Sequence, residues 1–265
     1  MRLFAKKLFV VLVVSFLSLG VFAVNAFAEG PILCGTDSDG HLQGFDSDGQ
    51  YIYWSLYSKI AKTDMNGNVV AEQPVKPHHG DCCVHDGKIY DAASIYSPNG
   101  KQRRITVYRC SDLAPVTEYE IQFDSSDAGT DGIFFQDGFF YVGEGKDPKS
   151  EQDYNWIHVF TPDFKWVRKI KIPGKTIYGV QTITFAHGSF WLGTYSGDRT
   201  YQCDENLNVI AHQKKVDTSV GAFGLPAGPN GEPRLMVARN VKKENGRWTA
   251  SCSSAILKNG ELVWE

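Results

Sequence analysis

The sequence predicts an all-β protein, a five-bladed β-propeller with four antiparallel strands in each blade. Three observations lead to this prediction. A polar residue followed by glycine recurs between alternating, β-prone segments, and a second strand–turn–strand segment follows each of these hairpins. No long helical periodicity appears after the N-terminal segment. Aromatic residues make up 13% of the chain, which suits sheets that pack face to face.

The N-terminal segment is typical of a cleaved signal peptide over residues 1–28, which would leave 29–265 as the propeller domain. Three basic residues precede an apolar run at 8–24, and Ala-Phe-Ala at 26–28 supplies a small-x-small cleavage site. An uncleaved anchor is the alternative, but the run is short for a membrane span. We therefore expect export, to a periplasm or to the medium, with no membrane span left after processing.

Five hairpin turns set the repeat, because glycine accepts the positive φ that a tight turn between two strands requires. The inner hairpins are expected at 45–55, 84–92, 135–143, 185–193 and 228–239. The turn glycines are 38 to 51 residues apart, a spacing typical of propellers, and they are Gly49, Gly87, Gly138, Gly188 and Gly231. The outer hairpins that complete the blades are expected at 58–75, 103–123, 155–174, 199–215 and 253–265.

The tetrapeptide Asp-Ser-Asp-Gly occurs twice, at 37–40 and 46–49, and suggests a calcium loop. An EF-hand loop needs oxygen ligands at fixed positions around an invariant glycine, and neither copy supplies the full set. Asp and Gly are also common turn residues. We interpret the second copy as the first hairpin turn of blade one, and the first copy as a turn that leads into that blade.

The two ends of the chain raise the question of how the ring closes. Blade one is expected to be complete from His41 onward and blade five to end the chain, so we expect no strand shared between the ends. All six cysteines follow the signal segment, and an even number in an exported protein suggests disulfides. A Cys34–Cys252 disulfide would join the N-terminal segment to blade five and contribute roughly 4–5 kcal/mol in the entropy model. The alternative is that both are buried thiols.

Channel-facing residues are expected on the innermost strands. In blade one this strand begins with His41 and Gln43, and in blade two it begins with His78, His79 and Asp81. Counted back from the turn glycines, His41 corresponds to His79, and Gln43 corresponds to Asp81. Alternate residues of a strand share a face, so these pairs would lie at equal depth in the channel.

Blades three and four contribute Asp131, Tyr178 and Gln181 to the same candidate site. Asp131 and Gln181 are one residue out of phase with the first two blades, so they would face the channel only if a β-bulge restores the phase. Blade five offers the segment 220–224, which would leave room for a ligand.

Three motifs stand before inner strands: H-x-Q-G at 41–44, H-H-G-D at 78–81 and G-[IV]-Q-T at 179–182. With them the sequence resembles a group of exported bacterial five-bladed β-propeller proteins. The resemblance covers nearly all of the processed chain. It implies the fold and a functional channel, and it implies no particular reaction.

His41, His79 and Asp81 form a candidate metal-ligand set, because two imidazoles and a carboxylate suit zinc, iron or manganese. Such a metal would polarise a bound oxygen or generate hydroxide for hydrolysis or elimination. The alternative is that these side chains only hydrogen-bond to water and to neighbouring strands in a wet channel. A glycosidase pair drawn from Asp81, Asp131 and Glu144 is a weaker hypothesis, because no family motif accompanies these carboxylates.

The leading hypothesis is therefore an exported, monomeric propeller whose channel binds a small polar molecule, such as a carbohydrate, or a metal ion. Two alternatives stay open: a metal-dependent hydrolase or lyase acting on a carbohydrate or lactone, and a protein-interaction scaffold. Nucleic acid is not an expected partner, because 30 acidic residues outnumber 27 basic ones and no basic cluster occurs.

Overall fold

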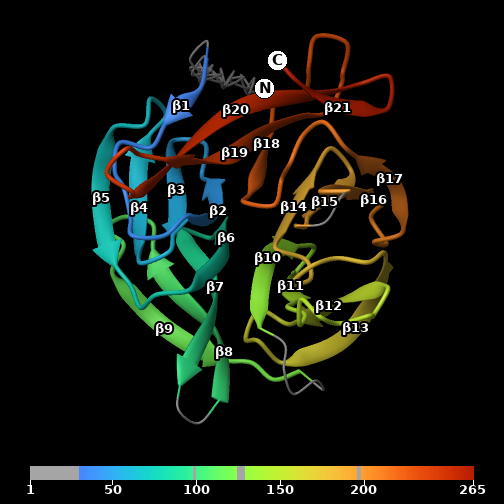
Figure 1. The fold of residues 1–265 in the computed structure, drawn as a ribbon, viewed down its shortest axis with the longest axis horizontal. Coiled ribbons are helices and arrows are strands. Elements are labelled where there is room, and N and C mark those ends of the chain that lie inside the picture. The colour runs from blue at the N-terminus through green and yellow to red at the C-terminus, as the bar shows by residue number, and fades with distance from the viewer. Residues whose placement is uncertain (1–29, 98–99, 124–128, 196–197) are drawn as a thin grey trace, which may run out of the picture.

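The computed structural model describes residues 30–97, 100–123, 129–195 and 198–265, and the predicted signal peptide lies outside these residues. The strands form five antiparallel sheets arranged as blades around a ring (Figure 1). This arrangement confirms the predicted five-bladed β-propeller. Within the described residues, no helix is long and apolar enough to cross a membrane.

The strands of each blade follow one another in chain order from the inside to the outside of the ring. Blade one contains β2 (Leu42–Ser47), β3 (Tyr51–Leu56), β4 (Lys59–Asp64) and β5 (Val69–Pro74). Blade two contains β6 (His79–His85), β7 (Lys88–Ser97), β8 (Gly100–Arg109) and β9 (Pro115–Glu120). Blade three contains β10 (Thr130–Gln136), β11 (Phe139–Glu144), β12 (Tyr154–Phe160) and β13 (Trp166–Pro173).

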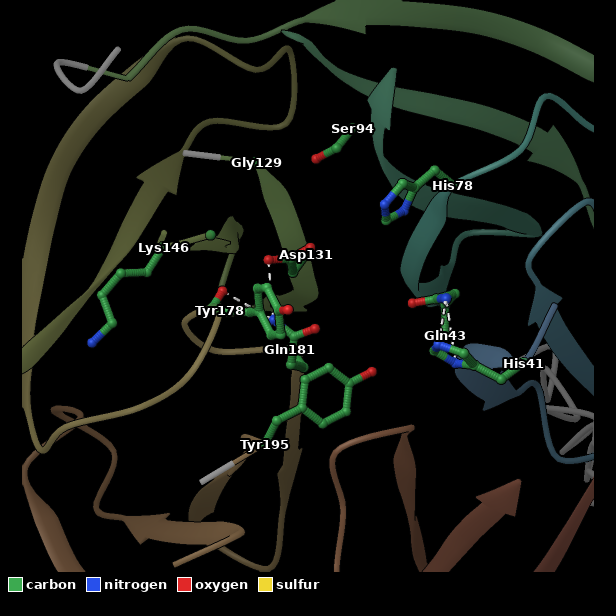
Figure 2. Close-up of a pocket in the computed structure, with 11 residues that line it drawn as sticks. His41, Gln43, His78, Ser94, Gly129, Asp131, Lys146, Tyr178, Gln181 and Tyr195 are labelled. Atoms are coloured by element: carbon green, nitrogen blue, oxygen red, sulfur yellow. Dashed lines mark hydrogen bonds between the residues drawn. The ribbon is translucent and has the colours of Figure 1, made fainter. Parts of the chain in front are cut away.

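Blade four contains β14 (Thr182–Ala186), β15 (Ser189–Gly193), β16 (Thr200–Cys203) and β17 (Val209–Gln213). Blade five contains β18 (Ala222–Leu225), β19 (Arg234–Lys242), β20 (Trp248–Lys258) and β21 (Glu261–Trp264), and it is joined by β1 (Ile32–Leu33). The innermost strands β2, β6, β10, β14 and β18 each contact the next, and β18 contacts β2 to complete the ring. The beginnings of these strands meet at one mouth of the channel, where polar side chains gather (Figure 2).

The inner hairpin turns adopt the backbone that their sequence predicts. Asp86 and Gly87 have φ values of 48° and 67°, and Asp137 and Gly138 have values of 50° and 83°. Positive φ at both central residues matches the right-handed twist of the flanking strands. The second Asp-Ser-Asp-Gly forms the β2–β3 turn, where Asp48 Oδ1 accepts hydrogen bonds from the backbone N–H groups two and three residues later. These bonds confirm the interpretation as a turn.

Strand β1 corrects the expected closure of the ring. It pairs antiparallel with β20, placing Ile32 opposite Cys252 and Leu33 opposite Ser251. β20 is 11 residues long, and β21 pairs only with its C-terminal part. The other half of this strand's edge is therefore free to pair with β1. The expectation that the chain ends share no strand is wrong, because the N-terminal segment belongs to the last blade (Figure 1).

The proposed Cys34–Cys252 disulfide is not formed in the structure, where all six cysteines are buried free thiols. The backbone N–H of Cys34 donates to Ala250 O at 2.8 Å, which places Cys34 opposite Ala250. Cys34 and Cys252 are therefore diagonal neighbours, and diagonal pairs are more widely separated than directly opposed ones. Antiparallel pairing with β20, rather than a covalent bond, fixes the N-terminal segment.

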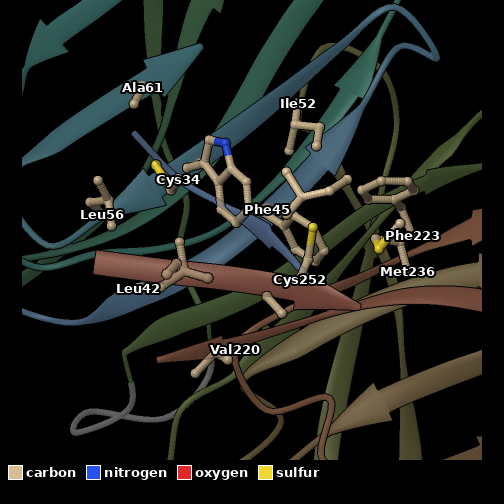
Figure 3. Packing of buried hydrophobic residues seen from close by; sticks show 14 of the residues in the cluster. Cys34, Leu42, Phe45, Ile52, Leu56, Ala61, Val220, Phe223, Met236 and Cys252 are labelled. Atoms are coloured by element: carbon tan, nitrogen blue, oxygen red, sulfur yellow. The ribbon is translucent and has the colours of Figure 1, made fainter. Parts of the chain in front are cut away.

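Blades five and one pack together through a hydrophobic cluster that includes both of these thiols (Figure 3). Phe45 of blade one stacks on Trp54 with 5.2 Å between ring centroids, and it contacts Phe223 of blade five at 5.0 Å. Burying a large apolar side chain contributes about 1.5–3 kcal/mol. The cluster thus holds the first and last blades together and keeps the inner strands in place around the channel.

Candidate functional site

A cavity of about 410 Å³ opens at the channel mouth where the inner strands begin (Figure 2). Blades one to four all contribute to its wall. Six of the eight predicted ligand-binding residues line it, namely His41, Gln43, His78, Asp131, Tyr178 and Gln181. The other two, His79 and Asp81, do not line this cavity and are buried.

Asp131 and Gln181 face each other across the boundary between blades three and four. Gln181 Nε2 donates to Asp131 Oδ2 at 3.1 Å and to Tyr178 O at 3.1 Å. The pairing of β10 with β11 shifts register between Thr130 and Ile133, which is the bulge that the out-of-phase position of Asp131 required. Gln181 is only 8% exposed, and its carboxamide oxygen has no hydrogen-bond partner within the described residues. That oxygen is therefore available to accept a hydrogen bond from a ligand.

His41 lies on the opposite side of the cavity, in blade one. Its Nδ1 donates to Leu42 O at 2.8 Å, because a carbonyl oxygen can only accept. The other ring nitrogen, Nε2, lies 3.5 Å from the Gln43 side-chain nitrogen. Blade one therefore presents an imidazole and an amide side by side.

His78 and Tyr178 have left-handed backbones, with φ values of 79° and 66°. His78 directly precedes β6, and Tyr178 lies in the segment that leads into β14. A residue with a side chain costs of order 1–3 kcal/mol in this conformation. Hydrogen bonds hold both in place: His78 N–H donates to Tyr57 O at 3.1 Å, and Tyr178 O accepts from Lys146 N–H at 2.9 Å. Strained positions of this kind cluster at functional sites, and these two both line the cavity.

Tyr178 and Tyr195 form an aromatic corner of the cavity. Their rings meet edge to face, with centroids 6.2 Å apart and an angle of 87° between planes. Burial raises the pKa of the Tyr195 hydroxyl, and the nearby charge of Asp131 raises it further. The hydroxyl therefore stays protonated and can donate a hydrogen bond.

Lys146 is among the lining residues, but its side chain extends away from the other labelled side chains (Figure 2). The Nζ donates to Gln152 O at 3.0 Å and to Tyr154 O at 3.4 Å. Burial lowers the pKa of this ammonium, and the charge of Lys175 lowers it further. Asp131 is consequently the main charged group directed at the cavity from the residues that line it.

The structure does not assemble the predicted metal-ligand set of His41, His79 and Asp81. His79 Nδ1 pairs with Asp91 inside blade two, and Ser55 Oγ donates to the other carboxylate oxygen of Asp91 at 2.7 Å. Among the described residues, no three or more His, Cys, Asp or Glu side chains are grouped to hold a metal ion.

Local backbone geometry determines which side chains of blade two reach the cavity. The pairing of β6 with β7 shifts register between His79 and Cys82, and His78 is left-handed. The bulge changes which side chains face the channel, so His78 takes the place predicted for His79. Counting positions back from the turn glycine identifies channel-facing residues only where side chains alternate without interruption along the strand. The bulge in β6 interrupts this alternation.

Only one of the three carboxylates of the glycosidase hypothesis lines the cavity. Glu144 is buried and accepts from His158 Nε2 at 2.6 Å, while Trp166 Nε1 donates to His158 Nδ1 at 3.2 Å. Both ring nitrogens of His158 are therefore committed to hydrogen bonds. Asp81 is likewise enclosed and bound to backbone N–H groups, which leaves Asp131 alone in contact with the cavity.

Sequence reasoning missed five lining residues: Ser94, Gly129, Gly145, Lys146 and Tyr195. Four of them lie near or just beyond the ends of β7, β11 and β15, the second strands of blades two to four. Because neighbouring strands are antiparallel, the end of each second strand meets the beginning of the inner strand. The last residues of each second strand and those just after it are therefore the sequence signal for these four.

Comparison with known proteins supports the fold. No protein-family model matches the sequence, and no curated protein matches it. The structure is similar to glutaminyl cyclase from Myxococcus xanthus, with a TM-score of 0.53 and 10% identity over 83% of this chain and 93% of that chain. It is also similar to a bifunctional GH43-CE protein from Bacteroides eggerthii, with a TM-score of 0.52 and 13% identity. That match covers 88% of this chain and 34% of the other. At these identities, the likeness shows a shared propeller fold.

Proposed function

We propose that this propeller binds a small, hydroxyl-rich molecule, such as a carbohydrate, in the cavity at its channel mouth. The observation that carries the proposal is the carboxamide of Gln181. Asp131 and Tyr178 O fix its nitrogen, and its oxygen is left without a partner within the described residues. Such a preorganised acceptor, buried in a concave wall, suits a ligand that donates a hydrogen bond.

The remaining lining fits the same class of ligand. A hydroxyl group both donates and accepts, so it matches amides and imidazoles, which supply both functions. Gln43, His41 and Gln181 provide them from two sides, and the rings of Tyr178 and Tyr195 provide apolar surface. The volume of about 410 Å³ lies within the usual range for small-molecule sites, roughly 300–1,000 Å³.

Calorimetric titration with a panel of neutral monosaccharides and disaccharides tests the proposal. We expect saturable binding of one molecule per chain by at least one member of the panel. Gln181→Ala should weaken that binding about 10-fold or more, the usual effect of removing one buried hydrogen bond. Gln50→Ala is the matched control, because Gln50 lies in the exposed β2–β3 turn and away from the cavity. No binding by any sugar, or equal weakening in both variants, would refute the proposal.

Product analysis of the same mixtures separates a binder from an enzyme. Asp131 is the carboxylate placed to act on a bound sugar, and a glycosidase ordinarily needs a second carboxylate beside it. We expect the sugars to be recovered unchanged after prolonged incubation. Conversion that disappears in Asp131→Asn would instead assign turnover to this cavity.

A further inference from the structure

A second cavity, of about 470 Å³, lies between blades four and five and shares Tyr195 with the central cavity. Its wall combines the segment that joins β17 to β18 with residues of β19 and β21. Apart from Tyr195, the residues of this wall do not line the central cavity. We refer to this space as the side cavity.

The side cavity carries an excess of positive charge. Arg199, Lys215 and Arg239 line it, against the single carboxylate of Asp217. Arg199 forms an ion pair with Asp217 at 2.5 Å, and Lys215 pairs at 2.8 Å with Glu261 outside the lining. Arg239 forms neither an ion pair nor a hydrogen bond with any residue that the structure describes.

Arg239 is held in place by an aromatic ring instead of a carboxylate. Its guanidinium carbon lies 3.5 Å from the centre of the Trp264 ring, in a cation–π contact. Stacking fixes the plane of the guanidinium and leaves its N–H groups at the edge unused. A planar fork of N–H donors matches the two oxygens of a carboxylate, phosphate or sulfate group.

Two uncharged donors complete the wall. Ser219 is only 3% exposed and lines the cavity, yet its hydroxyl has no hydrogen-bond partner in the described part of the chain. Asn240 Oδ1 accepts from Leu42 N–H at 2.8 Å, which fixes the amide and leaves its N–H groups to donate. Because Ser219 lines the cavity, its hydroxyl is available to hydrogen-bond to a ligand there.

We propose that the side cavity is an oxyanion site, which binds the carboxylate, phosphate or sulfate group of a small ligand. Arg239 supplies a preorganised cationic fork, and Ser219 and Asn240 supply neutral donors. A metal cation would be repelled by the same lining. The site stands independently of what the central cavity binds, although the shared Tyr195 would allow one ligand to reach both.

Calorimetry with inorganic phosphate, sulfate and glucuronate, at constant ionic strength in chloride, tests this site. We expect at least one of the three anions to bind with a stoichiometry of one. Arg239→Gln should raise its Kd about 10- to 100-fold, because hydrogen bonds to charged groups are the stronger ones. Ser219→Ala should raise it about 2- to 10-fold. The anion that binds tightest identifies the chemical group.

Arg168→Gln is the matched control, since Arg168 is exposed on β13 and makes the same change in net charge. Equal weakening in Arg168→Gln would show general electrostatic attraction and overturn the proposal, as would the absence of binding by all three anions. If Arg239→Gln does not fold, Arg239→Lys keeps the charge and removes the planar fork, and it should still weaken binding. Gln181→Ala should leave the binding of phosphate and sulfate unchanged, because these anions carry no sugar hydroxyls, and this result separates the side cavity from the central cavity.

Discussion

Asp81 of blade two accepts a hydrogen bond at 2.9 Å from the backbone N–H of Ile183 in blade four, 102 positions along the chain. The same carboxylate oxygen accepts from Ile133 N–H of blade three at 3.3 Å. Gly44 of blade one packs directly against this carboxylate. A Cβ atom at this position would lie only 2.3 Å from Asp81 Oδ1. One buried side chain therefore connects the inner strands of four blades.

Replacing Asp81 should destabilise the whole ring. Asp81→Ala leaves two buried N–H groups without acceptors, and we expect it to lower the free energy of unfolding by about 3–5 kcal/mol. Asp81→Asn keeps one acceptor oxygen and should cost less. Guanidinium denaturation measures the difference, with Asp163→Ala as the control because Asp163 is exposed. A loss below about 1 kcal/mol for Asp81→Ala would contradict the role of a connecting group.

Because β1 closes the ring, substitutions at its two adjacent residues, Ile32 and Leu33, should differ in their effect on the free energy of unfolding. Ile32 is 3% exposed and packs in the cluster between blades five and one, whereas Leu33 points outward and is 53% exposed. Ile32→Ala should lower the free energy of unfolding by about 2–4 kcal/mol, and Leu33→Ala should change it by less than about 0.5 kcal/mol. Thermal and chemical denaturation compare them directly. Similar effects in both variants would mean that β1 does not pack on β20.

The six thiols should be unreactive in the native protein. Burial raises the pKa of the Cys34 thiol to about 11 and raises that of Cys252 as well. Little thiolate is therefore present to react, and access is closed. We expect slow alkylation by iodoacetamide at pH 8 and modification of all six cysteines after unfolding in guanidinium. Mass spectrometry without reduction checks this result, and a peptide linked through Cys34 and Cys252 would contradict the free-thiol state.

Sequence reasoning located the blades and most of the cavity because both depend on local signals. A turn glycine and the alternation around it determine a hairpin, and residues just ahead of an inner strand necessarily reach the channel mouth. His79 does not line the cavity, and the sequence carries no local signal for the register shift in β6 or for the left-handed backbone of His78. β1 was missed because a strand of two residues carries no local pattern, and its partner β20 begins at Trp248.

Asp46 should make stability depend on pH between about 4 and 7. Its Oδ2 accepts from Val84 N–H at 2.6 Å, and burial raises the pKa of its carboxyl from 3.8 to about 7. In that pH range the folded protein keeps a proton that the unfolded chain releases. The free energy of unfolding therefore falls as pH rises from 4 to 7 and levels off above 7. At 1.36 kcal/mol per pKa unit, the contribution of this carboxyl is up to about 4 kcal/mol.

Asp46→Asn removes this titration while keeping an acceptor oxygen for the N–H of Val84 in blade two. We expect the free energy of unfolding of this variant to fall less than that of wild type between pH 4 and pH 7, so the difference between the two proteins should change by up to about 4 kcal/mol. Asp137→Asn serves as the control, because Asp137 is an exposed turn residue and should leave the profile parallel to that of wild type. Urea denaturation at half-unit steps of pH measures all three proteins. Parallel profiles for Asp46→Asn and wild type would mean that Asp46 is already ionised in the folded state at pH 4, and that the Val84 and Ser47 N–H groups outweigh the effect of burial.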